Sequence, residues 1–246
     1  MICTSKAIVL NKKNFSDSSL ICTIYSQEYG KVSIIAKGAR SIKNPSGATL
    51  EPLNHIDLVY YYKPKRSIQL FKEGSIIKKH YNISDSYKKS LYGLVMLDVV
   101  NYTSYVESPC NIIFRLINSS LFYIDKCSED KIIYYYLFFK LQLLIYLGYE
   151  PVFNYCSFCN QKIESGVFSE KTGQIVCSKC SSNKKTINNE SLLIIKKISK
   201  THIKHLNTIN KINEKVLLEI QKYLFKFILY HIPELNKSKA FIALNK

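Results

Sequence analysis

The segment CSFCNQKIESGVFSEKTGQIVCSKC, residues 156–180, carries the strongest local signal in the chain. Its four cysteines form two Cys-x2-Cys pairs separated by 17 residues: Cys156, Cys159, Cys177 and Cys180. Each pair puts two sulfurs on one tight turn, and turn signals at Gly166 and Gly173 predict a hairpin that brings the pairs face to face. Four thiolates so placed favour one tetrahedral Zn²⁺ ion with Zn–S distances of about 2.3 Å.

Three other interpretations of these cysteines are two redox-active motifs, a pair of disulfides and a chance pattern. A redox-active pair is expected between a strand and a helix of a thioredoxin-like unit, which the sequence lacks. Because four cysteines leave no coordination position for water, the ion would stabilise the segment and would not catalyse a reaction. The remaining cysteines lack ligand spacing and are expected to be buried thiols: Cys3, Cys22, Cys110 and Cys127.

Helical periodicity lies on both sides of the cysteine segment. We expect five helices, at residues 84–106, 109–124, 128–147, 190–206 and 214–231. Ser108, Ser128 and Asn213 are the expected N-caps of the second, third and last of these helices, and Gly148 is expected to end the third. The cysteine segment therefore interrupts a helical region.

The chain before these helices shows the two-residue period and the turn residues of short strands. Five strands are predicted, at residues 6–10, 19–26, 31–36, 54–62 and 67–80. Gly30 is expected to supply a positive φ in the turn after the second strand, and residues 40–49 to form a long loop. Five strands around such a loop favour an OB-fold, although an SH3-like barrel would give much the same pattern.

The predicted fold class is α+β: an N-terminal five-stranded OB-fold barrel, followed by an all-helical domain with an inserted four-cysteine zinc ribbon. The predicted segments are the barrel, the first helical part, the ribbon and the second helical part: residues 1–80, 81–149, 150–186 and 187–246.

Export and membrane insertion are both disfavoured. Eight cysteines in 246 residues are too few for a disulfide scaffold, and residues 1–15 contain no apolar leader segment. The longest apolar run, residues 132–149, contains Lys140 and Gln142 and is too short and too polar to cross a bilayer. We therefore expect a cytoplasmic protein with reduced thiols and no membrane partner.

The charge balance favours a polyanionic partner. The chain contains 35 Lys and Arg against 18 Asp and Glu, a net charge of +17. An AT-rich coding bias would also enrich Lys, which makes up 32 of the 35 cations. The excess is uneven, however: the barrel carries +8, the first helical part zero, the ribbon +2 and the second helical part +7. A Zn²⁺ ion with four thiolates adds −2, so the ribbon is expected to be a scaffold or a protein contact.

Seven cations are predicted to line a nucleic-acid groove on the barrel, in the third strand, the long loop and the connection between the last two strands: Lys31, Lys37, Arg40, Lys43, Lys63, Lys65 and Arg66. A solvated surface is the alternative for any one of them. Because side chains alternate along a strand, either Tyr61 or the Tyr60 and Tyr62 pair can stack on bases, at about 1–3 kcal/mol per base. Core packing is the commoner role for a tyrosine.

Seven short motifs also occur in the order found in one protein family: AIVL (7–10), YSQEYGK (25–31), AKGAR (36–40), LEP (50–52), GYEP (148–151), VFS (167–169) and SKAFI (238–242). With the four-cysteine ribbon among them, the chain resembles the RecO-type recombination mediators of bacterial DNA repair over nearly its whole length. One departure is that Ser41, Ile42 and Lys43 follow Arg40, where many relatives have several Arg. Lys keeps the attraction to phosphate but loses the bidentate geometry of Arg.

The resemblance implies that the chain binds single- and double-stranded DNA, anneals complementary strands and is not an enzyme. It also implies partnership with RecR, and through it help for RecA in replacing single-strand binding protein on DNA, at the bacterial nucleoid. The acidic, hydrophobic-ended tail of single-strand binding protein would need an apolar groove rimmed by Lys. We place this groove on the last predicted helix, with the ordinary amphipathic helix as the alternative: Lys215, Leu217, Lys222, Leu224 and Lys226.

Two other functions compete with this interpretation. An RNA-binding factor of the translation or transcription machinery would also combine an OB-fold with a zinc ribbon. A zinc hydrolase would need an open metal site, and four cysteine ligands argue against one. The sequence contains no Ser/His/Asp set, phosphate-binding glycine loop or paired acidic cluster that would support catalysis.

Overall fold

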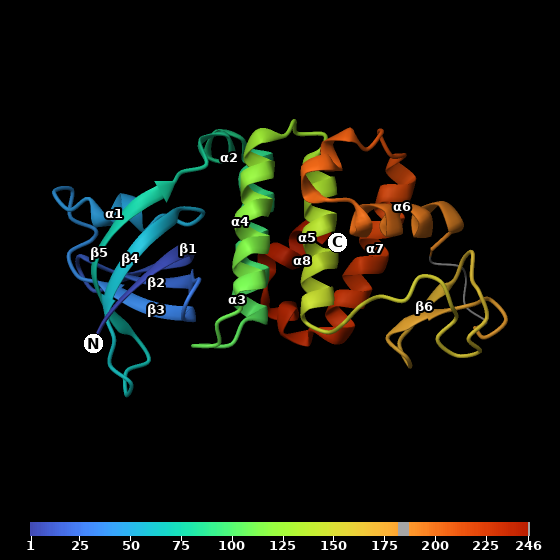
Figure 1. Cartoon of the computed structure of the whole chain (residues 1–246), viewed down its shortest axis with the longest axis horizontal. Coiled ribbons are helices and arrows are strands. Elements are labelled where there is room, and N and C mark those ends of the chain that lie inside the picture. Colours follow the sequence, from blue (N-terminus) through green and yellow to red (C-terminus); the bar gives the residue numbers. More distant parts are fainter. Residues whose placement is uncertain (182–186, 246) are drawn as a thin grey trace. The chain divides into compact units, whose positions relative to one another are not determined.

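The computed structural model of the chain describes residues 1–181 and 187–245 (Figure 1). It divides into two compact units, Met1–Glu129 and Asp130–Lys246. The division into segments 1–80, 81–149, 150–186 and 187–246 stays a prediction, and its limits at residues 186 and 246 lie outside the described residues.

The first unit begins with a closed five-stranded barrel, as predicted (Figure 1). Its strands are β1 (Ile2–Phe15), β2 (Ser19–Ser26), β3 (Gly30–Ala36), β4 (His55–Tyr61) and β5 (Gln69–Lys78). They follow the order β1-β2-β3-β5-β4, and β1 pairs with both β2 and β4. All pairs are antiparallel except a short parallel contact between β3 and β5. This topology is that of an OB-fold. The short helix α1 (Ser46–Thr49) lies in the long loop after β3.

Alternating apolar side chains fill the barrel. In β3, for example, Val32 and Ile34 are buried and Ser33 is half-buried on the outer side. Cys3 and Cys22 belong to the barrel core, as expected, whereas Cys110 and Cys127 are only half-buried. Burial raises the pKa of the Cys22 thiol to about 11, so this residue stays protonated at neutral pH.

An extended segment, residues 104–110, lies beside the start of β3. Val106 forms a backbone bridge with Lys31, and the Glu107 N–H donates to the Lys31 carbonyl at 3.0 Å. Gly30 has the predicted positive φ of 69°, and a Cβ there would lie 2.5 Å from the Ser108 carbonyl oxygen. The backbone of Ser108 therefore lies against the barrel. The next helix begins only after Cys110, so the predicted helix cap at Ser108 was wrong.

Three helices complete the first unit: α2 (Tyr81–Asp85), α3 (Tyr87–Thr103) and α4 (Asn111–Lys126). The Ser86 hydroxyl accepts from the Lys89 N–H and caps α3, whereas Cys110 precedes α4 without a side-chain cap. Of the predicted first helix, residues 84–106, only α3 and the end of α2 are helical, and Ser86 separates these two. Its predicted last residues, 104–106, belong to the extended segment, so that end was wrong.

The second unit contains helices and one small hairpin: α5 (Ile132–Tyr146), β6 (Val167–Ser169), β7 (Gln174–Val176), α6 (Asn189–Lys200), the 3-10 helices η1 (Ile203–Thr208) and η2 (Pro233–Lys237), α7 (Glu214–His231) and α8 (Lys239–Asn245). Asn213 caps α7 and Gly148 follows α5 with a φ of 84°, both as predicted. The N-cap of α5 is Lys131, so the predicted cap at Ser128 was wrong.

The two polar residues that interrupt the apolar run of α5 both join it to other helices. The Lys140 ammonium is buried, donates to Asn245 Oδ1 at 2.9 Å and lies 4.4 Å from the centre of the Tyr136 ring. Asn245 in turn donates to the Tyr136 hydroxyl at 2.8 Å, which ties α8 to α5. Gln142 donates to the Ser199 carbonyl of α6 at 2.9 Å. Burial lowers the pKa of Lys140 to about 7.

None of the helices in residues 1–181 and 187–245 combines the length and the apolar composition needed to cross a bilayer.

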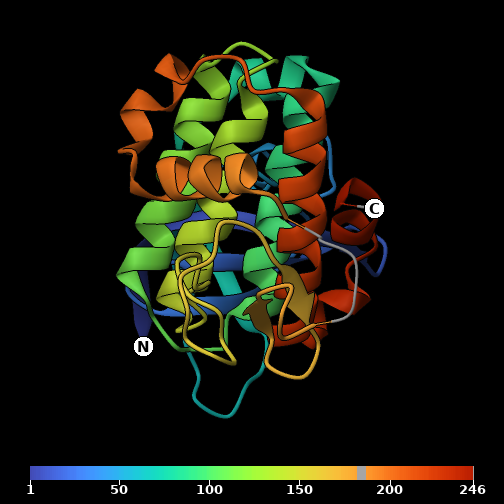
Figure 2. The same ribbon diagram turned by 90° about the vertical axis from the view of Figure 1, so that its right-hand side faces the viewer.

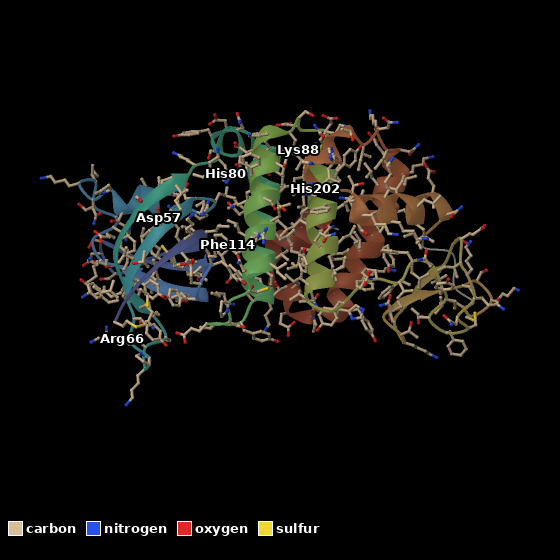
Figure 3. All side chains as sticks on the ribbon, viewed as in Figure 1. Asp57, Arg66, His80, Lys88, Phe114 and His202 are labelled. Carbon is tan, nitrogen blue, oxygen red and sulfur yellow. The ribbon has the colours of Figure 1, made fainter. Side chains whose placement is uncertain are left out.

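The barrel unit contains a buried histidine that makes stability depend on pH. His80 (Figure 3) follows β5, is 2% exposed, and neither of its ring nitrogens has a hydrogen-bond partner among the described residues. Burial lowers its pKa from 6.5 to about 4, and the nearby Asp125 only partly offsets this effect. Between pH 6.5 and about pH 4, His80 is therefore protonated in the unfolded chain but stays neutral in the folded chain.

We predict that acidification from pH 6.5 to pH 4 destabilises the barrel and that His80→Leu makes this pH dependence shallower. The measurement is urea unfolding at several pH values, followed by the methyl NMR signals of Ile56 and Leu58 in the barrel core. His205→Leu, at an exposed position, is the control. An unchanged pH dependence in His80→Leu would show that this histidine is not the responsible group.

Candidate metal site and nucleic-acid interface

The four cysteines of the two Cys-x2-Cys pairs come together as predicted. The sulfurs of Cys156, Cys159, Cys177 and Cys180 all lie within 4.8 Å of one another. Cys156 is buried and Cys159 is exposed, while the other two are half-buried. The Cys159 and Cys177 sulfurs are 3.8 Å apart, which equals the edge of about 3.8 Å of a tetrahedron with 2.3 Å metal–sulfur bonds.

Local backbone geometry holds the two pairs in place. Asn160 has a φ of 57° and its N–H donates to the Cys156 carbonyl at 2.9 Å, which closes the first turn. The Cys180 N–H donates to the Cys177 carbonyl at 3.0 Å in the second turn. At position 166, any Cβ would lie 2.3 Å from an Ile175 side-chain carbon, so a larger residue would clash. The hairpin between the pairs therefore requires glycine at this position.

Hydrogen bonds around the sulfurs favour a thiolate in part of the cluster. Burial of Cys156 opposes its ionisation, but backbone N–H groups, including that of Cys177 at 3.2 Å, lower its pKa to about 6. Hydrogen bonding to Cys159 raises the pKa of Cys180 to about 12. None of the eight cysteines, all of which lie within the described residues, forms a disulfide. A soft-donor set of this shape fits a tetrahedral metal ion.

The ribbon packs on α7 of the same unit, as Figure 2 shows for the β6/β7 hairpin. Phe168 of β6 meets Tyr223 edge to face, with ring centres 6.2 Å apart. The His231 ring nitrogen Nε2 is 2.9 Å from the Gly173 carbonyl. A Cβ at Gly173 would lie 2.2 Å from the Tyr230 ring, so this contact requires glycine.

The barrel cations occupy different environments. The Lys31 ammonium donates to the Asn101 carbonyl at 2.7 Å, and burial lowers its pKa. Lys31 therefore helps to hold α3 on the barrel, and its half-buried ammonium is less open to phosphate than an exposed one. Sequence reasoning missed this role because it depends on where the end of α3 lies.

The other six predicted cations are exposed, and two loops carry them: Lys37, Arg40 and Lys43 after β3, and Lys63, Lys65 and Arg66 between β4 and β5. The Arg40 N–H donates to the Ser18 carbonyl at 2.8 Å, which joins the first loop to the β1–β2 turn. The buried Gln69 side chain accepts from the Lys63 N–H at 2.9 Å and donates to the Arg66 carbonyl at 2.7 Å. Figure 3 shows Arg66 on this second loop.

Strand register forms one row of outward-facing side chains across the barrel. Ile21, Ile35, Leu70 and Tyr61 are successive partners on β2, β3, β5 and β4, and we call them the outer row. Tyr61 is 39% exposed, whereas Tyr60 is 1% exposed in the core. Of the two tyrosine alternatives, the structure therefore turns Tyr61 outward. The exposed Lys13 pairs with Ile21 and extends the row, which sequence reasoning missed because it ended the first strand at residue 10.

The predicted partner groove on α7 is not an open groove. Lys215, Lys222 and Lys226 are exposed and Leu217 is half-buried. Leu224 is fully buried in the core and cannot line a groove. The helical spacing places Leu224 on the apolar face of α7, and the rest of the unit covers that face.

A cavity of about 350 Å³ lies elsewhere in the second unit, between α5, α6 and the segment after α5. Apolar and charged side chains both line it, among them Leu141, Ile145, Phe153, Lys196 and Lys200, together with the acidic Glu150. Burial lowers the pKa of Lys196, and the nearby charges of Lys162 and Lys200 lower it further. The cavity therefore combines apolar walls with two lysines and one carboxylate.

Comparison with known proteins gives the family. Residues 1–80 match the family model described as Recombination protein O N terminal, and residues 84–240 match the one described as Recombination protein O C terminal.

Curated relatives agree with these matches. DNA repair protein RecO of Caldicellulosiruptor saccharolyticus is 30% identical over 242 residues, which cover 91% of this chain and 98% of that protein. The protein of the same name from Thermodesulfovibrio yellowstonii is 29% identical over 230 residues, 90% of each chain. That from Salinibacter ruber is 31% identical over 150 residues, 61% of this chain and 57% of that protein. The chain belongs to the recombination protein O (RecO) family of DNA repair proteins.

Proposed function

We propose that this RecO-family chain binds single- and double-stranded DNA on its barrel, anneals complementary strands and, with RecR, helps to load RecA onto DNA coated with single-strand binding protein. The observation that carries the proposal is the outer row, an apolar and aromatic line of side chains with exposed cations at its margins. The family supplies the context of DNA repair. The partners follow from the resemblance of the sequence to the family.

The outer row suits a single strand because bases and phosphates find different partners on it. Tyr61 offers a ring on which a base can stack, and Ile21, Ile35 and Leu70 offer apolar contact. Seven exposed cations can contact the phosphates: Lys13, Lys37, Arg40, Lys43, Lys63, Lys65 and Arg66. Lys31 is left out because its ammonium is half-buried as well as bonded to the Asn101 carbonyl, whereas Arg40, which donates to the Ser16 carbonyl, is exposed.

Contacts of this kind are independent of the DNA sequence. Annealing requires this independence, because any pair of complementary strands must be accepted. Phosphate neutralisation and base stacking read neither groove of a duplex. A surface that neutralises phosphates also reduces the repulsion between two complementary strands. Strand annealing forms base-pair hydrogen bonds but neither makes nor breaks a covalent bond, so we propose no catalytic residue.

We propose that the cysteine cluster binds one structural Zn²⁺ ion. The tetrahedral edge between Cys159 and Cys177 and the all-sulfur donor set support zinc, and the closed ligand set supports a structural role. When bound, the ion would replace the hydrogen bonds among the four thiols by metal–sulfur bonds. The turns at Asn160 and Cys180 would then be held from both sides.

We place the tail of single-strand binding protein in the cavity between α5 and α6 rather than on α7. An acidic peptide with a hydrophobic end needs an apolar recess next to cations. Phe153 and Leu141 line such a recess beside Lys196 and Lys200. On α7 the lysines are exposed, but Leu224 is buried, so they flank no recess.

The first prediction concerns DNA binding. If five to seven phosphates are neutralised, log K should fall with log salt with a slope of about −3.5 to −5 on a single strand. Lys37→Glu with Arg40→Glu should weaken binding and make the slope shallower by about 1.4, because each lost contact removes about 0.7. Fluorescence anisotropy with a labelled oligothymidine at several salt concentrations measures both.

The control is Lys88→Glu with Arg115→Glu, which reverses the same two residue types at exposed positions of α3 and α4. Equal losses in both double variants would mean that net charge, and not the barrel surface, decides affinity. A slope shallower than about −1 for the unmodified chain would exclude the groove. Competition with structured RNA tests the RNA-binding alternative, which predicts RNA as the tighter ligand.

Metal analysis tests the zinc site. The purified chain should contain one zinc ion, and Cys159→Ser should lose it because a structural site needs all four ligands. Hydrogen exchange of residues 154–180 should then accelerate, while DNA affinity stays within about twofold. Cys127→Ser, outside the cluster, is the control and should keep its zinc. A metal-free chain with an equally protected ribbon would contradict the assignment.

Peptide binding distinguishes the two partner sites. Lys196→Glu with Lys200→Glu should weaken binding of a tail peptide of single-strand binding protein by at least about tenfold, because two charge contacts are reversed. Lys222→Glu with Lys226→Glu should leave it nearly unchanged. Isothermal titration calorimetry measures both affinities. The opposite result would place the peptide site on α7.

A further inference from the structure

A second cavity lies in the first unit, at the end of the barrel where β1 starts and β4 ends. Its volume is about 300 Å³, and it is lined by three tyrosines and two acidic residues, which we call the tyrosine pocket: Tyr29, Tyr60, Tyr62, Glu28 and Glu107, with Met1, Cys3 and Pro109 beside them. The β2–β3 turn, the end of β4 and the extended segment 104–110 supply these residues. Neither the outer row nor the cysteine cluster contributes to it.

The tyrosines give the pocket aromatic walls. Tyr29 and Tyr60 meet edge to face, with ring centres 6.0 Å apart at an angle of 88°. The Tyr62 hydroxyl donates to Glu107 Oε2 at 3.3 Å. The pocket is thus lined by aromatic side chains and by a carboxylate that a hydrogen bond orients.

The pocket is acidic in a strongly basic chain. Glu28 and Glu107 are exposed, and the described residues that line the pocket include no Lys or Arg. The only cation in the lining is the amino terminus of Met1, which already donates to the Tyr62 carbonyl at 3.3 Å. Ser5 donates to Glu28, which orients that carboxylate.

Both carboxylates also contribute to the raised pKa values of neighbouring tyrosines. A hydrogen bond with Cys3 and burial raise the pKa of Tyr29, and the charge of Glu28 raises it further. Burial raises the pKa of Tyr62, and Glu107 adds to the effect. A cation in the pocket would gain from the charges that disfavour a phenolate.

We propose that the tyrosine pocket receives an arginine side chain from a partner protein. A guanidinium is flat, stacks on aromatic rings and donates two parallel hydrogen bonds to a carboxylate, so it matches the walls and both acids. An ammonium lacks the flat face and the paired donors. A nucleic acid is disfavoured, because its phosphates would approach two carboxylates.

Exposed apolar side chains around the pocket favour a protein over a small cation. Tyr105 and Val106 are 82% and 64% exposed on the segment that carries Glu107. Met1 and Ile2 are 78% and 54% exposed at the start of β1. A central arginine anchor surrounded by apolar contacts is typical of the energetic centre of a protein interface. The barrel would then bind a polyanion on its outer row and a cationic protein at its end.

The test uses the full chain and an acetylated, amidated pentapeptide, Ala-Leu-Arg-Leu-Ala, with the ring signals of ¹³C-labelled tyrosines as the readout. The signals of Tyr29 and Tyr62 are assigned from Tyr→Phe variants. Two further peptides replace the arginine by lysine or by neutral citrulline. We expect saturable shifts of both tyrosine signals with the arginine peptide, weaker binding with the lysine peptide and no binding with the citrulline peptide.

The double variant Glu28→Gln with Glu107→Gln should weaken binding of the arginine peptide at least about tenfold. Its affinity for DNA should be no lower than that of the unmodified chain. Both positions are exposed, so the variant should fold. Asp17→Asn with Asp57→Asn removes two other exposed barrel carboxylates and should leave peptide binding unchanged. Equal binding of the citrulline peptide, no effect of the glutamine pair, or no saturable shift up to millimolar peptide would each overturn the proposal. So would a mononucleotide that shifts the same signals in place of the peptide.

Discussion

The closure of the barrel by β1 is the constraint on which the other features depend. Because β1 pairs with β2 along one edge and with β4 along the other, the sheet has no free register. Each strand position is then fixed as inside or outside. This fixes Tyr60 in the core and Tyr61 on the surface, and it aligns Ile21, Ile35 and Leu70 into one row. A slip of one residue would exchange these roles.

The same closure separates two surfaces of opposite charge. Exposed cations border the outer row, whereas Glu28 and Glu107 gather with three tyrosines at the barrel end. The half-buried ammonium of Lys31 is held by the Asn101 carbonyl, and burial lowers its pKa. The cysteine cluster is a separate constraint within the second unit, where metal ligation would do for a short hairpin what a large core does for the barrel.

Features set by local chemistry could be predicted from the sequence. The bounds of β2, the positive φ of Gly30, the cap at Asn213 and the meeting of the four cysteines all follow from short-range patterns. Features set by distant partners could not. Polar residues 11–14 belong to β1 only because β2 pairs with them. Ser108 faces Gly30 in place of capping a helix, and Leu224 is covered by the rest of its unit. The network of Lys140 and Asn245 joins residues 105 positions apart.

The most direct test of the central claim is a map of amide and methyl NMR shifts of the full chain on addition of an oligothymidine. The account predicts that shifts centre on Ile21, Ile35, Tyr61 and Leu70 and on the two basic loops at residues 37–45 and 62–68. Shifts confined to the second unit, with the barrel signals unmoved at saturation, would contradict it.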